Sequence, residues 1–339
     1  MSRRDTFIID AVRTPIGNFG GSLAMIRTDN LASHVIRSLM IRHDFDPEII
    51  DDVILVCANQ AGEDNRNVAR MALLLAGFPF TVPGETVNRL CASGMSAVIH
   101  AHRAIQSDDG KLFIAGGVEH MTRGPWVISK ASKSFGRDSK MEDSSFGWRF
   151  INPKMEEIYG TEGMGQTAEN VAEKYNISRQ DQDAFAARSH KQASAAQKNG
   201  RFNTEIEFVE IPQKKSEPVK FSEDEFIKPH TSLDGLEKLR PAFKKDGTVT
   251  AGNSSGLNDG AAAMLIASEE GMNVHGLKPL ARVITSAVVG VEPRIMGMGP
   301  VHASKKALKK AGLTMKDICL LYTSPSPRDL STSRMPSSA

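Results

Sequence analysis

Cys91 is the residue whose setting in this sequence points most directly to covalent chemistry. It lies in the run ETVNRLCASGMSAVIHAHRAI (85–105), in which Thr86–Asn88 is typical of a strand end and Met95–Ile105 of a helix. A cysteine at or just before a helix N-terminus has its thiolate stabilised by unpaired backbone N–H groups and by the helix dipole. We therefore expect Cys91 to act as a nucleophile and its backbone N–H to contribute to an oxyanion hole, which the small residues 92–94 leave accessible. The alternative is a buried core cysteine, the commoner fate of a lone Cys.

The other two cysteines indicate no disulfide framework and no metal centre. Cys57 and Cys319 are far from Cys91 in sequence, and no CxxC spacing occurs. An odd number of widely spaced cysteines argues against a zinc site and favours a reducing compartment, so we expect a cytoplasmic protein without a metal. Cys57 lies in an apolar run and is expected to belong to the core.

Length and composition predict an ordinary globular α/β protein. The 339 residues allow one large or two smaller domains, and 42 Lys and Arg against 40 Asp and Glu leave a net charge of +2. Such a balance supplies no strong field for nucleic acid or an anionic membrane, and we expect neither partner. The N-terminal apolar run is too short for a signal peptide or a membrane span.

Hydrophobic periodicity and capping residues predict the elements that must position Cys91. We expect helices over Asn30–Arg42, Asn65–Ala76, Ser178–Asn199 and Ser304–Ala311, another opening at Thr167, and strands over Thr6–Val12, Val53–Cys57, Lys111–Gly116, Glu205–Ile211 and Ala261–Ala267. Between residues 122 and about 240 the composition becomes more polar and irregular, which predicts a loop domain laid over the core. A faint repeat relates 34–56 to 302–321 and suggests a duplicated βα unit, the second copy being incomplete.

Several motifs together resemble the thiolase family. They are AVRTPIG (11–17), NRLCASG (88–94), AGGVE (115–119), TAEN (167–170), TAGNSSGLNDGAA (250–262) and GMGPV (297–301), in family order across 5 to about 318. Within thiolases, the stretches 57–72, 147–155 and 290–301 resemble the 3-oxoadipyl-CoA thiolases of aromatic-compound degradation.

The resemblance implies a fold of two duplicated βαβαβαββ halves in layers, with an inserted loop domain and an incomplete second half. We predict an N-terminal half over 1–121, a loop domain over 122–250, part of the second half over 251–321 and a non-native or disordered tail over 322–339, where Ser and Pro make up half of the residues. It also implies acyl-CoA and CoA as ligands, with CoA a co-substrate rather than a bound cofactor, and a homodimer or homotetramer.

The resemblance assigns roles to individual positions. Cys91 aligns with the nucleophile, Ser255 with the serine at the pantetheine of CoA, and Ala251 with a neighbouring contact. Lys228 stands where many members have an arginine near the adenine. Gly163 replaces the histidine of the acetoacetyl-CoA enzymes, which weighs against that specificity.

Three family motifs that complete the site are not in this sequence: an Asn in NEAF, a His in GHP that activates the nucleophile, and a second Cys in CxGxG. We therefore expect little turnover from the chain alone. The nine histidines are expected to be structural or exposed. The leading hypothesis is thiolysis of 3-oxoadipyl-CoA to succinyl-CoA and acetyl-CoA. The alternatives are a general 3-ketoacyl-CoA or acetoacetyl-CoA thiolase, and a non-catalytic CoA- or lipid-binding protein of the same fold; a β-ketoacyl synthase fits the sequence around Cys91 less well.

Overall fold

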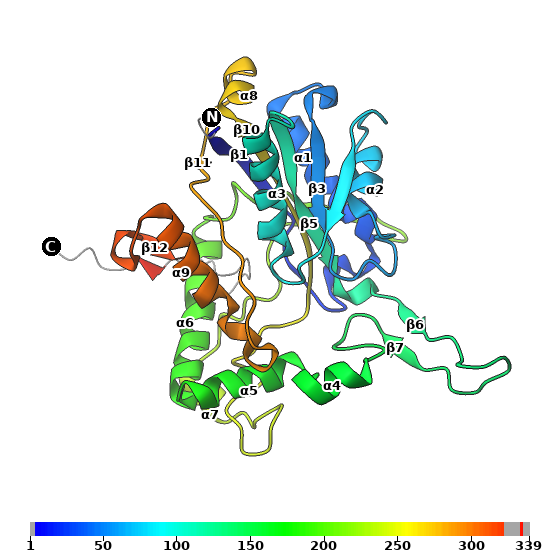
Figure 1. Ribbon diagram of the computed structural model, residues 1–339, viewed down its shortest axis with the longest axis vertical. Helices are drawn as coiled ribbons and strands as arrows, with labels where there is room; N and C mark the ends of the chain where they lie inside the picture. Colours follow the sequence, from blue (N-terminus) through cyan, green and yellow to red (C-terminus); the bar gives the residue numbers. More distant parts are fainter. Residues whose placement is uncertain (1–3, 322–332, 335–339) are drawn as a thin grey trace. The chain divides into compact units, whose positions relative to one another are not determined.

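The computed structural model describes residues 4–321 and 333–334, which form two compact units (Figure 1). Of the described residues, the first unit comprises 4–145, 202–225 and 257–284, and the second comprises 146–201, 226–256, 285–321 and 333–334. Each unit is therefore assembled from stretches that are separate in the sequence. In the part of the chain that is described, no helix combines the length and the apolar character needed to cross a membrane.

The first unit is built on one mixed sheet of seven strands. Its path is β11-β1-β10-β5-β3-β4, and β2 pairs with β10. The elements of this unit are β1 (Thr6–Arg13), β2 (Gly17–Asn18), α1 (Thr28–His43), β3 (Asp52–Val56), α2 (Val68–Leu75), β4 (Gly84–Val87), α3 (Ser93–Ser107), β5 (Leu112–His120), β6 (Trp126–Ile128), β7 (Met141–Asp143), β8 (Val209–Ile211), β9 (Val219–Phe221), β10 (Asn258–Ser268), α8 (Glu269–Val274) and β11 (Ala281–Arg282). β3 runs parallel to β4 and to β5, whereas β10 is antiparallel to both β1 and β5.

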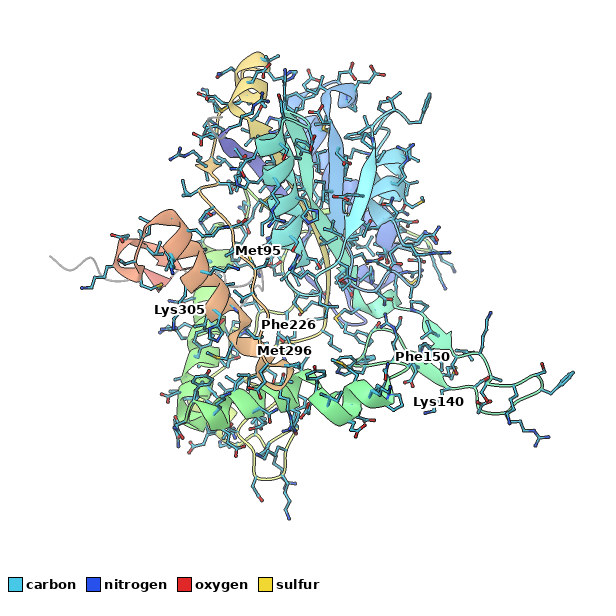
Figure 2. All side chains as sticks on the ribbon, in the orientation of Figure 1. Met95, Lys140, Phe150, Phe226, Met296 and Lys305 are labelled. Atoms are coloured by element: carbon cyan, nitrogen blue, oxygen red, sulfur yellow. The ribbon has the colours of Figure 1, made fainter. Side chains whose placement is uncertain are left out.

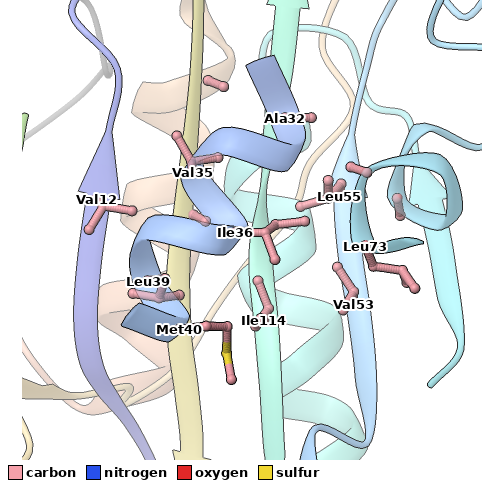
Figure 3. Close-up of a cluster of buried hydrophobic side chains, with 14 of the residues drawn as sticks. Val12, Ala32, Val35, Ile36, Leu39, Met40, Val53, Leu55, Leu73 and Ile114 are labelled. Atoms are coloured by element: carbon pink, nitrogen blue, oxygen red, sulfur yellow. The ribbon is translucent and has the colours of Figure 1, made fainter. Parts of the chain in front are cut away.

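The central strands are apolar at successive positions because both faces of the sheet are covered. Val53 and Leu55 contribute to one buried cluster, while Ile54 between them contributes to the other. Helices α1 and α2 pack in the first cluster, shown in Figure 3, and α3 packs in the second through Ala97, Ala101 and Ile105. Alternate side chains of a strand point to opposite faces, so a strand enclosed between two helical layers reads as a continuous apolar run.

This element order confirms the predicted α/β fold and corrects one of its boundaries. From β1 to β5, and then to β10, the chain reads βαβαβαββ, with the loop segments inserted before the last strand. The predicted second half, 251–321, includes β10, but β10 pairs with β1 and β5 in the first sheet. Strand pairing therefore places β10 with the first half; the rest of the predicted division stays a prediction.

Within the first unit, the segment 202–225 is fastened to the end of β1 by Arg13. Its guanidinium donates to both carboxylate oxygens of Asp224 at 2.8 and 3.0 Å and to Glu205 at 2.8 Å, and it lies 5.3 Å from the centre of the Phe202 ring. Asp224 is buried and also accepts the backbone N–H of Ile16 at 2.8 Å. Arg13 therefore serves as an anchor for this insertion.

The second unit is mainly helical. Its elements are α4 (Pro153–Tyr159), α5 (Met164–Lys174), α6 (Arg179–Lys198), α7 (Leu233–Glu237), α9 (Gly299–Ala311), β12 (Leu320–Leu321) and β13 (Ser333–Arg334). The predicted start of α6 is confirmed, because the Ser178 side chain accepts the N–H of Asp181. Of the predicted tail, 322–339, only β13 is described, paired antiparallel with β12, and the remaining residues lie outside the described structure.

Candidate active site

Cys91 occupies a tight elbow between β4 and α3, as the sequence predicts. β4 ends at Val87, α3 begins at Ser93, and Cys91 itself is exposed. The alternative of a buried core cysteine is therefore wrong for this residue. Met95, labelled in Figure 2, marks the same end of α3.

The elbow bends through a left-handed residue. Leu90, directly before Cys91, has φ of 48°, a conformation that costs a residue with a Cβ about 1–2 kcal/mol. The turn is closed by hydrogen bonds from the N–H of Ala92 to the carbonyl of Arg89 at 3.1 Å and from the N–H of Ser93 to the carbonyl of Leu90 at 2.9 Å. The donors in these two bonds are the N–H groups of Ala92 and Ser93. The N–H of Cys91, the predicted oxyanion donor, takes part in neither bond.

The elbow lies at the carboxyl edge of the parallel strands. β3, β4 and β5 run in the same direction, so the residues that follow Val56, Val87 and His120 leave the sheet at one edge. In α/β sheets this edge is where ligands bind. The sheet therefore presents Cys91 where a substrate can approach it.

Cys57 follows β3 and has the opposite environment. It is 1% exposed, and its thiol donates to Asp64 at 3.2 Å. Burial raises the pKa of the Cys57 thiol well above its ordinary value, and the negative charge of Glu119 adds to the effect. The prediction that Cys57 belongs to the core is confirmed, and its chemistry is that of an inert thiol.

The second unit contains a cavity of about 320 Å³ that holds two of the three predicted CoA residues. Lys228 and Ala251 line it, together with Leu236, Leu239, His190, His230, Thr231, Ser232, Gly235 and Gly252. Two leucine side chains beside one ammonium and two hydroxyl groups are typical of small-molecule sites. Ser255 does not line this cavity; it is exposed at the end of the same loop.

Lys228 is held by two neighbours. Its backbone N–H donates to Nδ1 of His190 at 3.2 Å, and its ammonium lies 5.3 Å from the centre of the Phe226 ring, labelled in Figure 2. His190 is buried on α6. Gly256 packs so closely on Phe226 that a Cβ there would overlap the ring, which ties the residue after Ser255 to the support of Lys228. Lys228, Ala251 and Ser255 thus belong to one local assembly.

The loop that carries Ala251 and Ser255 is clamped by buried carboxylates. Glu169 of α5 accepts the N–H groups of Thr248 and Val249 at 2.9 and 2.8 Å. Asn253 donates to Asp183 at 2.9 Å and accepts the N–H of Thr250 at 2.7 Å. Backbone donors satisfied by buried acceptors in this way fix the path of a loop that has no regular structure.

Sequence reasoning missed the two histidines of the cavity. His190 lies 38 positions before Lys228 and on another element, so no local pattern connects them. His230, two residues after Lys228 in the run KPH, could have been noticed as a second nitrogen-bearing side chain beside it.

Comparison with known proteins gives the family. The model of the thiolase N-terminal domain matches residues 6–270, and that of the thiolase C-terminal domain matches residues 277–324. The chain is 55% identical over 315 residues to a beta-ketoadipyl-CoA thiolase of Pseudomonas knackmussii, covering 93% of this chain and 78% of that protein. It is 52% identical over 316 residues to the 3-oxoadipyl-CoA/3-oxo-5,6-dehydrosuberyl-CoA thiolase of Escherichia coli, with 93% and 79% coverage.

A solved structure agrees with these matches. The human mitochondrial 3-ketoacyl-CoA thiolase in complex with CoA superposes with a TM-score of 0.86 at 37% identity, covering 97% of this chain and 81% of that one. The chain belongs to the thiolase family.

Proposed function

We propose that this protein catalyses the CoA-dependent thiolytic cleavage of a 3-oxoacyl-CoA, with 3-oxoadipyl-CoA as its substrate and succinyl-CoA and acetyl-CoA as its products. The observation that carries the proposal is the exposed Cys91 at the strained elbow before α3. The names of the relatives that are 52–55% identical support the choice of substrate.

The Cys91 thiolate attacks the 3-keto carbon, and the developing oxyanion is met by the N–H of Cys91. The bond between C2 and C3 then breaks, and its electron pair leaves with the acetyl-CoA fragment, which takes up a proton. The succinyl group remains on the Cys91 sulfur as a thioester. The thiol of a second CoA attacks this thioester, forms succinyl-CoA and returns the thiolate, and the proton that this thiol loses replaces the one taken up by the acetyl-CoA fragment.

The cavity around Lys228 and Ala251 is proposed to bind part of the CoA moiety, with Ser255 at the pantetheine. The Lys228 ammonium offers a charge for a phosphate or an adenine edge, and the Leu236 and Leu239 side chains offer apolar contact. No covalently bound cofactor is needed for this chemistry. A homodimer or homotetramer in the cytoplasm is part of the same proposal.

The half-reaction tests the proposal without requiring complete turnover. The family assigns activation of the nucleophile and proton transfer to GHP and CxGxG motifs that this sequence does not contain, so we propose that turnover by residues 1–339 alone is slow. The reverse of the last step, acyl transfer from succinyl-CoA to Cys91 with release of CoA, does not use the carbanion. The assay is intact-protein mass spectrometry after incubation with succinyl-, acetyl- or butyryl-CoA, with Cys91→Ala as the control.

We expect an adduct on Cys91 that forms fastest with succinyl-CoA and is absent from Cys91→Ala. Equal rates with all three donors would favour a general 3-ketoacyl-CoA thiolase. CoA binding with no adduct from any donor would contradict the nucleophilic role and favour a non-catalytic CoA-binding protein.

A further inference from the structure

Asn88, the last residue before the elbow, bridges two backbone groups with its carboxamide. Its Oδ1 accepts the N–H of Leu90 at 2.8 Å, and its Nδ2 donates to the carbonyl of Ala58 at 3.1 Å. If the amide oxygen and nitrogen were exchanged, the NH2 group would face the N–H of Leu90 and the oxygen would face the carbonyl of Ala58. These two partners therefore fix the orientation of the Asn88 carboxamide. Asn88 thereby links the residue before Cys91 to the loop that follows β3.

Leu90 needs a restraint on its backbone conformation, because a side chain so exposed gains little from packing. It is 68% exposed and has φ of 48°. A non-glycine residue stays in the left-handed region only where its surroundings over-determine it. Here the determinants are backbone hydrogen bonds: the N–H of Leu90 to Asn88, and the carbonyl of Leu90 from Ser93 at 2.9 Å.

The anchor of Asn88 is itself fixed from a third strand. The N–H of Ala58 donates to Oε2 of Glu119 near the end of β5 at 2.7 Å, while the carbonyl of Ala58 receives Asn88. The ends of β5, β3 and β4 are thus joined in series by Glu119, Ala58 and Asn88. The AGGVE motif, which contributes no group to the proposed chemistry, acquires a role in this series through Glu119.

We propose that Asn88 is a positioning residue for Cys91: by holding Leu90 in its left-handed conformation, its carboxamide keeps the thiol at the N-terminus of α3. This inference rests on the proposed nucleophilic role of Cys91. Without the bond from Leu90 to Asn88, the elbow relaxes to an extended or helical φ, and the Cys91 sulfur leaves the field of the helix N-terminus. The loss is one of thiolate stabilisation rather than of substrate contact.

The test measures the reactivity of Cys91 in the whole chain, without substrate. The rate of alkylation by iodoacetamide is followed from pH 5 to 10 by mass spectrometry of the peptide that contains Cys91. The exposed Cys319 of the same chain serves as an internal reference. The variant is Asn88→Ala. Its matched control is Asn67→Ala. The Asn67 carboxamide also donates to a backbone carbonyl, that of Gly84 at 3.0 Å, but Gly84 lies at the opposite end of β4 from Asn88.

In the unaltered chain we expect Cys91 to react faster than Cys319 at pH 7. In Asn88→Ala we expect the Cys91 rate at pH 7 to fall about tenfold, toward that of Cys319. Asn67→Ala should leave the Cys91 rate unchanged, whatever it does to stability. Adding Leu90→Gly to Asn88→Ala should recover part of the rate, because glycine adopts this φ without steric cost.

The outcomes separate the two proposals. If Cys91 in the unaltered chain reacts no faster than Cys319, the nucleophilic role itself fails. If Cys91 is activated but Asn88→Ala leaves its rate unchanged at every pH, or if Asn67→Ala lowers that rate as much, the positioning role of Asn88 is refuted and Cys91 is activated by other groups.

Discussion

Replacing Glu169 tests whether a single buried carboxylate holds the loop of the proposed CoA site. Glu169 is 3% exposed, and its Oε1 accepts the backbone N–H groups of Thr248 and Val249. Its Oε2 accepts the Thr248 hydroxyl at 3.2 Å. In Glu169→Ala the buried N–H of Val249 and the half-buried N–H of Thr248 lose their acceptor, at about 1–3 kcal/mol for a fully buried group. Because water can enter the space and satisfy one of these N–H groups, we expect the free energy of unfolding to fall by about 2–4 kcal/mol.

Glu169→Gln should be milder, for a reason visible in the same contacts. The amide oxygen can take the place of Oε1 and keep both N–H groups. The amide nitrogen then faces the Thr248 hydroxyl and also the Thr248 N–H, which donates to Oε2 at 3.0 Å as well as to Oε1. The hydroxyl already accepts from Gln182 at 2.9 Å, so its own proton loses its acceptor. The cost is then the charge assistance plus the two weak bonds to Oε2, about 1–2 kcal/mol.

The two tryptophans make the assay specific to one unit. Trp126 belongs to the first unit and Trp148 to the second. In a Trp126→Phe background, urea unfolding followed by Trp148 fluorescence reports on the unit that contains Glu169. CoA binding, measured by calorimetry in the same background, should weaken about tenfold in Glu169→Ala. The loop must then be ordered on binding, and a cost of about 1.4 kcal/mol for this ordering raises the Kd tenfold.

A matched control is Glu173→Ala, one turn further along α5. Glu173 is exposed and pairs only with Lys244 at 2.8 Å among the ion pairs described. Exposed pairs contribute little, so its urea midpoint should be unchanged. The reasoning is refuted if Glu169→Gln costs as much as Glu169→Ala, or if Glu169→Ala unfolds at the same urea concentration as the parent.

Further predictions concern the cavity and two titrating groups. Lys228→Met keeps the apolar stem but removes the charge, and calorimetry should show CoA binding weakened about three- to tenfold. His190→Leu should also weaken CoA binding. His190→Asn should weaken CoA binding less, because the Asn side chain can still accept the Lys228 N–H. Burial lowers the pKa of His34 below its ordinary value, so the unfolded state binds more protons and stability falls as the pH drops through about 6.5; in His34→Gln the urea midpoint should depend less on pH between 7 and 5. Burial, with repulsion from Glu85 and a neighbouring aspartate, raises the pKa of Asp52, so its ionised form is a penalty at neutral pH. Asp52→Asn should raise Tm at pH 7, with a gain that shrinks toward pH 4; a Tm that is lower at pH 7 would contradict this account.

Local signals in the sequence were sufficient where the residues that decide an element are neighbours. Ser178 and Asp181 mark the start of α6 because both halves of the cap lie within four residues. α5 instead begins at Met164, before the predicted Thr167, whose hydroxyl is not a cap but donates to the carbonyl of Met164 at 2.8 Å within the helix.

Long-range contacts account for what could not be predicted. The predicted cap Asn30 lies inside α1, which begins at Thr28, because the N–H of Thr28 is received at 3.1 Å by Glu63, 35 residues away. The prediction of a strand over 205–211 was too long for a similar reason. β8 spans only Val209–Ile211, while the carbonyl of Glu205 and the N–H of Glu207 bond to the backbone of Arg13 at 2.8 Å. The cavity likewise depends on His190 and Lys228, which only the fold brings together.

The motifs shared with the thiolases differ in the kind of constraint that they encode. In NRLCASG the cysteine is exposed, and the surrounding hydrogen bonds shape the backbone around it. In AVRTPIG the charged side chain, Arg13, forms ion pairs with the buried carboxylate of Asp224 and with Glu205. All three residues belong to the first unit. A group committed to a buried ion pair has no capacity left for a ligand, because breaking the pair would leave an uncompensated charge. A motif match therefore supports a proposal about chemistry where the structure leaves the matched group exposed, as at Cys91. It indicates shared architecture where that group is held in a buried ion pair, as at Arg13.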